Sequence, residues 1–426
     1  MSKTPNILVF QTDDHARWAL PCYGGTDFAA PTLDRLAARG VVMEDAYTPT
    51  PVCSPARASF FTGLMPSQHG VRDFISSLPD YIGQDWLQGI DTLPQELQRA
   101  GYRCGLSGKW HIGRDSTPAP GFDHWHAMSG AFPIRHQGRH ELSLDGEVVT
   151  RDGILTEVIT DGALRFLDSR TDDRPFFLYV GYYATHSPWS GHASQYLPTD
   201  DTDPAPGDIP LPEGYELLNV ELPGADAALA REARRQYRAA VAEIDAGLAR
   251  ILAALPEGED TIIVYTSDHG LSLGQRGIFG KGNGTWPQNL FDENVRIPMI
   301  LSRPGHWPEG TRQGGFCDHT DLHALLRASA GLTGAPEDGR PRPGRNPLAG
   351  PAKPFQVCEY GTVARLVEQD GPGAERRAGG PLPDPEARAR LDAFYAGLDC
   401  QPPWDWHPPE GYAFNPTDAW KAPRRG

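Results

Sequence analysis

The chain of 426 residues is 39% hydrophobic and 22% charged, with a formal net charge of -16. This composition excludes a disordered or fibrous protein, and the length predicts one large domain and a smaller one. Because no Lys/Arg-rich block interrupts the acidic background, we do not expect nucleic-acid binding, although a few local cations could still bind a small anion.

The compartment is predicted from the cysteines and the apolar runs. The six cysteines have no CxxC spacing, and the amino terminus lacks a charged-then-apolar leader. No apolar run reaches the length of about 18 residues that a membrane-spanning helix needs. We therefore expect a cytoplasmic protein without a membrane anchor.

The first predicted strand, residues 6–14, is an apolar and β-branched run whose carboxyl end carries Asp13 and Asp14. A compact helix follows over residues 31–40, where Pro comes early and Gly last. A second helix is predicted over residues 92–101, with a capping Thr92. The next stretch is typical of a strand that runs into a loop.

Two further apolar strands share the design of the first. One ends on His186, and the other ends on Asp268 and His269. The residues between them repeat at alternating four- and three-residue spacing, which predicts a long amphipathic helix: Tyr237, Val241, Ile244, Leu248, Ile251 and Leu255. Strands that alternate with helices predict an α/β fold whose sheet is largely parallel, with helices on both faces.

Two segments rich in proline mark the outline of the domains. Residues 197–214 are rich in Pro and Asp and are predicted to form an irregular surface excursion. Residues 334–354 are rich in Gly, Pro and Arg and indicate a boundary. We therefore expect a large domain over residues 1–350 and a smaller α+β subdomain over residues 351–426.

Acidic side chains at the ends of different strands would repel one another unless a cation lay between them. A metal site is therefore one interpretation, and oxygen ligands favour calcium, magnesium or manganese over zinc. The alternative is that each pair of polar residues starts a solvated loop or caps a helix. The residues alone leave both interpretations open.

Basic residues in two other stretches suit an anionic ester. In an extended segment, Lys109 and His111 would point to the same side, and Lys281 stands among glycines where the backbone can approach a ligand. Ordinary exposed side chains and a flexible turn are the alternatives.

The run CSPAR places Cys53 near the start of a predicted helix, where amide donors favour negative charge. Arg57 follows one turn later and could reach back toward position 53. A buried small cysteine with a surface-covering arginine is one alternative, and a thiolate nucleophile is another.

Taken together, six motifs resemble the sulfatase family of the alkaline phosphatase superfamily, in the family's order. They cover roughly the first three quarters of the chain, and the CxPxR pentapeptide before ASFFTG is the most specific of them. The motifs are QTDDH, CSPARASFFTG, GKWHIG, THSPW, TSDHG and FGKG. The resemblance implies an alkaline-phosphatase-like fold and hydrolysis of a sulfate ester to an alcohol and inorganic sulfate.

The resemblance also implies a modified residue and a metal. Cys53 would be oxidised to Cα-formylglycine by a separate maturation enzyme. Its hydrate would share one divalent ion with Asp13, Asp14, Asp268 and His269. Calcium is the first expectation, with manganese or magnesium as alternatives; many relatives have Asn where His269 stands, which makes manganese more plausible than usual.

The remaining roles follow from the same resemblance. Arg57 would position the hydrate, and Lys109 and Lys281 would bind sulfate oxygens. His111 would handle a proton near the hydrate, and His186 near the leaving group. The carboxyl-terminal quarter departs from the family pattern, so its small sheet is expected to be reduced or rebuilt.

Two other functions stay open at this point. A phosphonate monoester or phosphodiester hydrolase of the same superfamily would share these motifs. A non-catalytic binder of sulfated ligands would result if Cys53 stayed a thiol. The sequence predicts neither the oligomeric state nor exo or endo action.

Among sulfate esters, we expect a sulfated carbohydrate as the substrate. Trp110, Trp189 and Trp286 lie beside the motifs and could stack on a sugar ring or serve the core. Arg72 and Asp73 could bind hydroxyls or a second charge, or be solvated surface residues.

Overall fold

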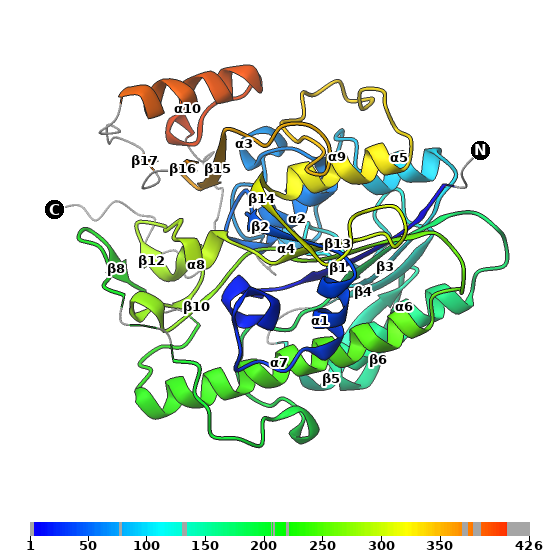
Figure 1. Cartoon of the computed structure of the whole chain (residues 1–426), viewed down its shortest axis with the longest axis horizontal. Helices are drawn as coiled ribbons and strands as arrows, with labels where there is room; N and C mark the ends of the chain where they lie inside the picture. The colour runs from blue at the N-terminus through cyan, green and yellow to red at the C-terminus, as the bar shows by residue number, and fades with distance from the viewer. Residues whose placement is uncertain are drawn as a thin grey trace.

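The computed structural model describes residues 4–75, 79–129, 134–205, 207, 209–218, 221–368, 374–377 and 385–406. Its centre is a ten-stranded mixed sheet in the order β14-β2-β13-β9-β1-β7-β3-β4-β5-β6 (Figure 1). The strands are β1 Asn6–Thr12, β2 Val41–Ala46, β3 Arg103–Gly108, β4 His124–Met128, β5 Gln137–Leu144, β6 Glu147–Ile154, β7 Phe176–Gly181, β9 Thr261–Ser267, β13 Met299–Ser302 and β14 Thr311–Cys317. The run from β9 to β4 is parallel, which confirms the predicted α/β class.

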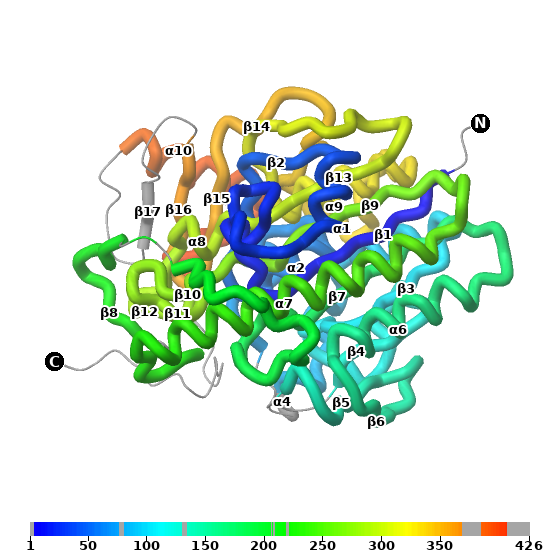
Figure 2. The backbone as a smooth tube through the Cα atoms, turned by 60° about the horizontal axis from the view of Figure 1, so that its bottom comes forward, coloured from blue at the N-terminus to red at the C-terminus, as the bar shows by residue number. Residues whose placement is uncertain are grey.

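The sheet is buried on both faces, as its continuous apolar strands require. On β1, Leu8 and Phe10 face one hydrophobic cluster, and Ile7 and Val9 face the other. The first face is covered by α1 Pro31–Ala38, α6 Leu155–Asp168 and α7 Ala227–Ala253, and the second by α2 Cys53–Thr62, α5 Leu93–Arg99 and α9 His319–Ser329 (Figures 1 and 2). The three predicted helices are therefore confirmed, although Leu255 lies beyond the end of α7.

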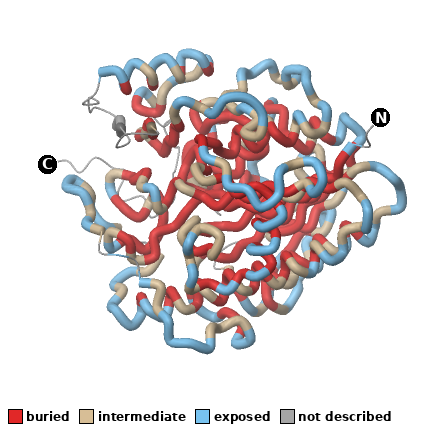
Figure 3. The backbone as a smooth tube through the Cα atoms, in the orientation of Figure 1, coloured by how far each residue is buried: buried red, intermediate tan, exposed pale blue. Residues whose placement is uncertain are grey.

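Shorter elements surround this frame, and most of the exposed backbone belongs to them and to loops (Figure 3). The helices are α3 Pro66–His69, α4 Pro79–Ile82, α8 Asp292–Val295 and α10 Pro385–Gly397. The strands are β8 Glu216–Leu217, β10 Ser272–Leu273, β11 Phe279–Gly280, β12 Thr285–Trp286, β15 Phe355–Tyr360, β16 Val363–Glu368 and β17 Ala374–Arg377. The 3-10 turns are Arg17–Ala19, Pro21–Tyr23, Ser194–Tyr196, Gln275–Gly277, Gly282–Gly284 and Pro403–Asp405.

The carboxyl-terminal part forms a small antiparallel sheet, β15-β16-β17, with α10 packed beside it. Glu359 on β15 joins this sheet to the large domain, because its carboxylate accepts hydrogen bonds from Ser67 Oγ at 2.7 Å and Tyr395 Oη at 2.6 Å. Parts of the divergent stretch, residues 371–373, 378–384 and 407–426, lie outside the described residues. The described parts show that a small sheet is present.

The structure bears on two sequence features, the apolar runs and the cysteines. Within the described ranges, no helix has both the length and the apolarity to cross a bilayer. All six cysteines fall in those ranges, and none is in a disulfide.

Close packing of α6 and α7 predicts an effect on stability. A Cβ added at Gly247 on α7 would lie 2.5 Å from Tyr182 Oη and 2.6 Å from Thr160 Oγ1. We expect Gly247→Ala to lower the free energy of unfolding by about 1–3 kcal/mol through overpacking, measured by urea denaturation. At the end of α10, Gly397 has open space around it, and Gly397→Ala is the matched control, expected to be neutral or to stabilise by less than about 1 kcal/mol. Equal losses for both variants would contradict this packing argument.

Candidate active site

Three neighbouring parallel strands bring the predicted acids together. Thr12 of β1 pairs with Ser267 of β9, and Asp13 and Asp268 are the next residues along their strands. β7 lies on the other side of β1, and His186 follows it in a loop. The site therefore lies at the carboxyl ends of the central strands, where open α/β sheets place ligands.

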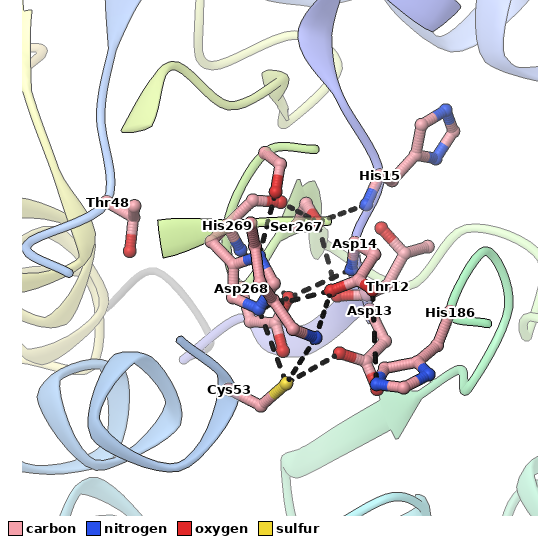
Figure 4. Close-up of polar contacts among 12 residues, drawn as sticks. Thr12, Asp13, Asp14, His15, Thr48, Cys53, His186, Ser267, Asp268 and His269 are labelled. Atoms are coloured by element: carbon pink, nitrogen blue, oxygen red, sulfur yellow. Dashed lines mark hydrogen bonds and ion pairs between the residues drawn. The ribbon is translucent and has the colours of Figure 1, made fainter. Parts of the chain in front are cut away.

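Cys53 is the first residue of α2, and every residue of this helix is buried. Its sulfur lies 3.2 Å from Asp13 Oδ1, 3.3 Å from His269 Nε2 and 3.3 Å from Lys281 Nζ (Figure 4). The structure thus brings the cysteine of the CxPxR run into the group of strand-end residues.

The Cys53 thiol is held in its neutral form. Burial raises its pKa well above the ordinary value, and Asp13 adds to this effect, while Lys109 and Lys281 oppose it. A reactive thiolate needs the opposite shift. The surroundings therefore argue against the interpretation of Cys53 as a thiolate nucleophile.

The buried Arg57 guanidinium neutralises the acids of two strands. It forms an ion pair with Asp268, with Nη2 3.0 Å from Oδ2, and its Nη2 lies 3.8 Å from Asp13 Oδ1. Nη1 donates to Tyr179 Oη at 2.9 Å and to the Lys109 carbonyl at 3.2 Å. Arg57 is thus fixed between the ends of β1 and β9 and contacts the carboxylates that surround residue 53.

The two predicted lysines complete the positive side of the site. Lys109 Nζ contacts Asp13 Oδ2, and Lys281 Nζ donates to Asp14 Oδ1 at 2.8 Å. Both lysines are buried. Burial alone would lower the pKa of Lys281, but Asp14 outweighs it, and the ammonium stays charged.

The carboxylates respond unequally to this shared burial. Burial acts to raise the pKa of Asp13, but Lys109 and other cations outweigh it, and the pKa falls well below its usual value. Burial raises the pKa of Asp14, and Glu221 and Asp13 raise it further. Burial, followed by Asp13, raises the pKa of Asp268 to about 7. Two of the three carboxylates, Asp14 and Asp268, are therefore harder to ionise than an ordinary carboxyl group when no further cation is bound.

Two of the histidines turn an unprotonated nitrogen toward the acids. His269 Nδ1 donates to the Gly270 carbonyl at 2.9 Å, and His186 Nδ1 donates to the Ser187 carbonyl at 2.7 Å. Burial, aided by Lys281, lowers the pKa of both rings well below the ordinary value. Each Nε2 is therefore a lone pair near Asp14, at 3.2 Å for His269 and 3.9 Å for His186. Lone pairs that face carboxylate oxygens are typical of a cation site.

The backbone around His111 differs from the prediction. β3 ends at Gly108, and His111 has a φ of 58°, in the left-handed region, so the chain is not extended at His111 and the argument from an extended segment was wrong. Its Nε2 donates to the Ile75 carbonyl at 3.2 Å, and Nδ1 is buried with no partner in the described chain. Burial and Lys109 lower the pKa of His111, which leaves Nδ1 as an acceptor.

Of the residues considered for substrate binding, four are buried and one, Trp286, is partly exposed. Trp110 and Trp189 are buried in the core, whereas Trp286 is 38% exposed. Arg72 and Asp73 are buried and not solvated surface residues: Arg72 donates to the carbonyl of Gln401 at 3.4 Å, and Asp73 accepts from Tyr360 Oη at 2.7 Å. Both therefore connect the large domain to its carboxyl-terminal part.

Three residues that contact the site residues had no clear signal in the sequence. Tyr179 supports Arg57, and Thr185 Oγ1 donates to the Asp14 carbonyl at 2.9 Å. Glu221 lies 3.6 Å from Lys281 Nζ, through Oε1. The first two could have been sought in the apolar strand before His186. Glu221 comes from the irregular segment before α7, where no pattern marks it.

The Sulfatase family model matches residues 5–331 of the chain. The chain belongs to the sulfatase family. It is 27% identical over 399 residues to an N-acetylglucosamine-6-O-sulfatase of Bacteroides thetaiotaomicron, covering 78% of this chain and 68% of that protein. It is 29% identical over 359 residues to the human N-acetylgalactosamine-6-sulfatase, covering 77% of this chain and 62% of the human protein. By family and by these relatives it is a sulfuric ester hydrolase.

Solved structures share the fold. One, of a protein in complex with its substrate D-glucosamine-2-N,6-O-disulfate, has a TM-score of 0.71 at 24% identity and covers 93% of this chain and 95% of that one. Another, in complex with k-i-k-neocarrahexaose, has a TM-score of 0.69 at 21% identity, with 96% of each chain covered. At these identities the likeness concerns the fold alone.

The buried ion pair of Arg57 predicts a large effect on stability. Without this guanidinium, Asp13 and Asp268 would be buried with one cation fewer, so Arg57→Met should cost about 3–5 kcal/mol of unfolding free energy in the presence of a chelator. Arg250 pairs with Asp161 on the surface at 2.7 Å, and Arg250→Met should cost less than about 1 kcal/mol. Denaturant unfolding of both variants measures the difference, and comparable losses would show that Arg57 does not carry this role.

Proposed function

We propose that this chain hydrolyses a sulfate ester after Cys53 has been converted to formylglycine by a separate maturation enzyme. One observation carries the proposal. The sulfur of Cys53, at the start of a buried helix, lies among three acids and within reach of buried cations. A thiol held neutral is a weak nucleophile, so its position is better explained as that of a precursor.

The donor set fits a divalent cation. Ligand atoms of Asp13, Cys53, Asp268 and His269 all lie within 4.8 Å of one another, and a second such group adds Asp14 and His186. Asp14 Oδ2 is buried and accepts no hydrogen bond within the described residues. Oxygen-rich ligation favours calcium and allows magnesium, while the His269 nitrogen makes manganese more plausible than it would otherwise be.

Four residues would hold the cation: Asp13, Asp14, Asp268 and His269. When bound, the cation would draw electron density from an oxygen of residue 53 and offset the carboxylates. The hydrated aldehyde would supply one hydroxyl to attack sulfur and a second whose deprotonation releases sulfate.

The basic residues would bind and orient the ester. Lys109 and Lys281 approach residue 53 from different segments and would neutralise charge that grows on the sulfuryl oxygens. Arg57, fixed by Asp268 and Tyr179, would hold residue 53 in place. These cations are buried, so water screens them little and each contributes strongly.

The histidines would move protons at defined atoms. His111 Nδ1, unprotonated and without a partner among the described residues, is suited to accept a proton from the hydroxyl of residue 53. His186 Nε2 lies near Asp14 and Lys281 and would serve the leaving oxygen together with that lysine. Both rings are neutral in this structure. That state suits His111 as a proton acceptor, whereas the proton for the leaving oxygen would come from the charged Lys281, beside His186.

The proposed substrate class is a sulfated carbohydrate. The relatives named above act on sulfated amino sugars, as their names state. The partly exposed Trp286 is the candidate among the three tryptophans to stack on a sugar ring.

The cation site predicts a dependence on pH. A carboxylate must lose its proton to bind a metal, and the pKa of Asp268 in the metal-free chain is about 7. Affinity for Ca²⁺ should therefore be about tenfold weaker near pH 6 than near pH 8, measured by isothermal titration calorimetry. Asp268→Asn should bind Ca²⁺ weakly and reduce this pH dependence to the part that comes from Asp14, whose pKa is also raised. An affinity that is constant over this range would argue against Asp268 as a ligand.

Conversion of Cys53 gives the direct test of the proposed function. After co-expression with a formylglycine-generating enzyme, mass spectrometry should show sulfur and two hydrogens of residue 53 replaced by one oxygen. Cys53→Ala should release no sulfate from an aryl sulfate, whereas Cys22→Ala, remote from the site, should keep wild-type turnover.

The alternatives give different outcomes in the same assay. Faster turnover of a phosphonate monoester or phosphodiester would favour that hydrolase activity. An unconverted thiol that binds sulfated ligands without turnover would favour a non-catalytic binder. Full activity in purified Cys53→Ala would refute the proposed function.

A further inference from the structure

Glu221 is a fourth carboxylate beside the site, and the proposed reaction does not use it. It lies in the segment between β8 and α7, and its side chain is 10% exposed. Its Oε1 is 3.6 Å from Lys281 Nζ, and the same ammonium lies 2.8 Å from Asp14 Oδ1 and 3.3 Å from the Cys53 sulfur. One lysine thus links Glu221 to the reacting residue.

The second oxygen of Glu221 lacks a hydrogen-bond partner in the part of the chain that the structure describes. Oε2 is buried and makes no hydrogen bond within the described residues. A buried carboxylate oxygen that has left water without gaining a donor is unfavourable. A ligand that supplied a donor at this point would remove the penalty.

The position of Glu221 is set by the loop that carries Lys281. The Leu218 amide donates to the Gly284 carbonyl at 3.0 Å, and β8 pairs with β12 just beyond it. A Cβ built at Gly280 would lie 3.9 Å from Glu221 Cγ, which shows that the side chain rests against the start of this loop. The carboxylate is therefore held beside Lys281.

Lys281 does not need Glu221 to stay protonated. Asp14 is the main influence that keeps the pKa of this lysine raised, and the contact with Glu221 is too long for a hydrogen bond. A carboxylate also repels an anionic ester. Its presence at the wall of an anion site therefore indicates a part of the ligand other than the sulfate group.

We infer that Glu221 determines specificity for the leaving alcohol: its free oxygen accepts a hydrogen bond from a donor near the ester, and its charge rejects a second anionic group. The inference rests on the proposed function and narrows its substrate class. The donor is a hydroxyl or an ammonium group. A sugar with a sulfate or carboxylate at that place is disfavoured.

Competition among defined esters tests this inference. Matured, Ca²⁺-loaded wild type and Glu221→Gln are compared with an aryl sulfate as the reference substrate, and each sugar is titrated as its competitor. Glucosamine 6-sulfate supplies an ammonium, glucose 6-sulfate a hydroxyl, and N,6-disulfated glucosamine a second anion. Glu213→Gln removes an exposed charge just before β8 and is the matched control.

We expect selective changes in the inhibition constants. For Glu221→Gln the constant of glucosamine 6-sulfate should rise about tenfold relative to KM of the aryl sulfate, since a charge-assisted hydrogen bond is lost. For glucose 6-sulfate the rise should be smaller, because glutamine can still accept a hydrogen bond. The inhibition constant of the disulfated sugar should fall, because the variant no longer carries the charge that repels the second anionic group.

Two outcomes would overturn the inference. A parallel change for the aryl sulfate and all sugars would show that Glu221 acts through Lys281 alone. Unchanged ratios would show that it does not contact the alcohol. If wild type releases no sulfate from any ester, the proposed function itself fails, and that result is visible before any variant is compared.

Discussion

The site depends on holding like charges side by side where water is excluded. Asp13, Asp14 and Asp268 meet because β1 and β9 are parallel and in register, and a shift of one residue would turn Asp13 to the other face. Their repulsion is offset by Arg57 and two lysines from separate segments. The sheet, α2 and the loop after β11 therefore all contribute charges that must lie together to neutralise one another. This link explains why polar residues lie at the centre of an apolar frame.

Much of this arrangement could be predicted from the sequence, for physical reasons. Continuous apolar strands that end in acids place those acids at one edge of a parallel sheet, and the regular spacing after Tyr237 indicates a long helix. Features set by the local backbone could not be predicted, and the left-handed φ at His111 is an example. Long-range contacts without a pattern were also missed: Glu221 lies in an irregular segment, and Asp73 was not expected to pair with Tyr360.

The histidines show how main-chain geometry sets chemistry. His111, His186 and His269 each donate one ring nitrogen to a backbone carbonyl, and the other nitrogen is left as an acceptor. A carbonyl cannot donate, so the protonated nitrogen is fixed by the path of the chain and not by another titrating side chain. The protonated nitrogen of each ring therefore depends on the local backbone, and a change of the backbone there would alter it without removing the histidine.

The burial of α2 has a consequence for the order of events in the cell. All ten residues of the helix are buried, from Cys53 to Thr62, so the native chain offers no surface on which another enzyme could read the CSPAR run. If Cys53 is modified as we propose, recognition of this run would have to precede folding of the chain around it. The rate of folding would then compete with the rate of modification, and a chain that folded first would be trapped with an ordinary thiol.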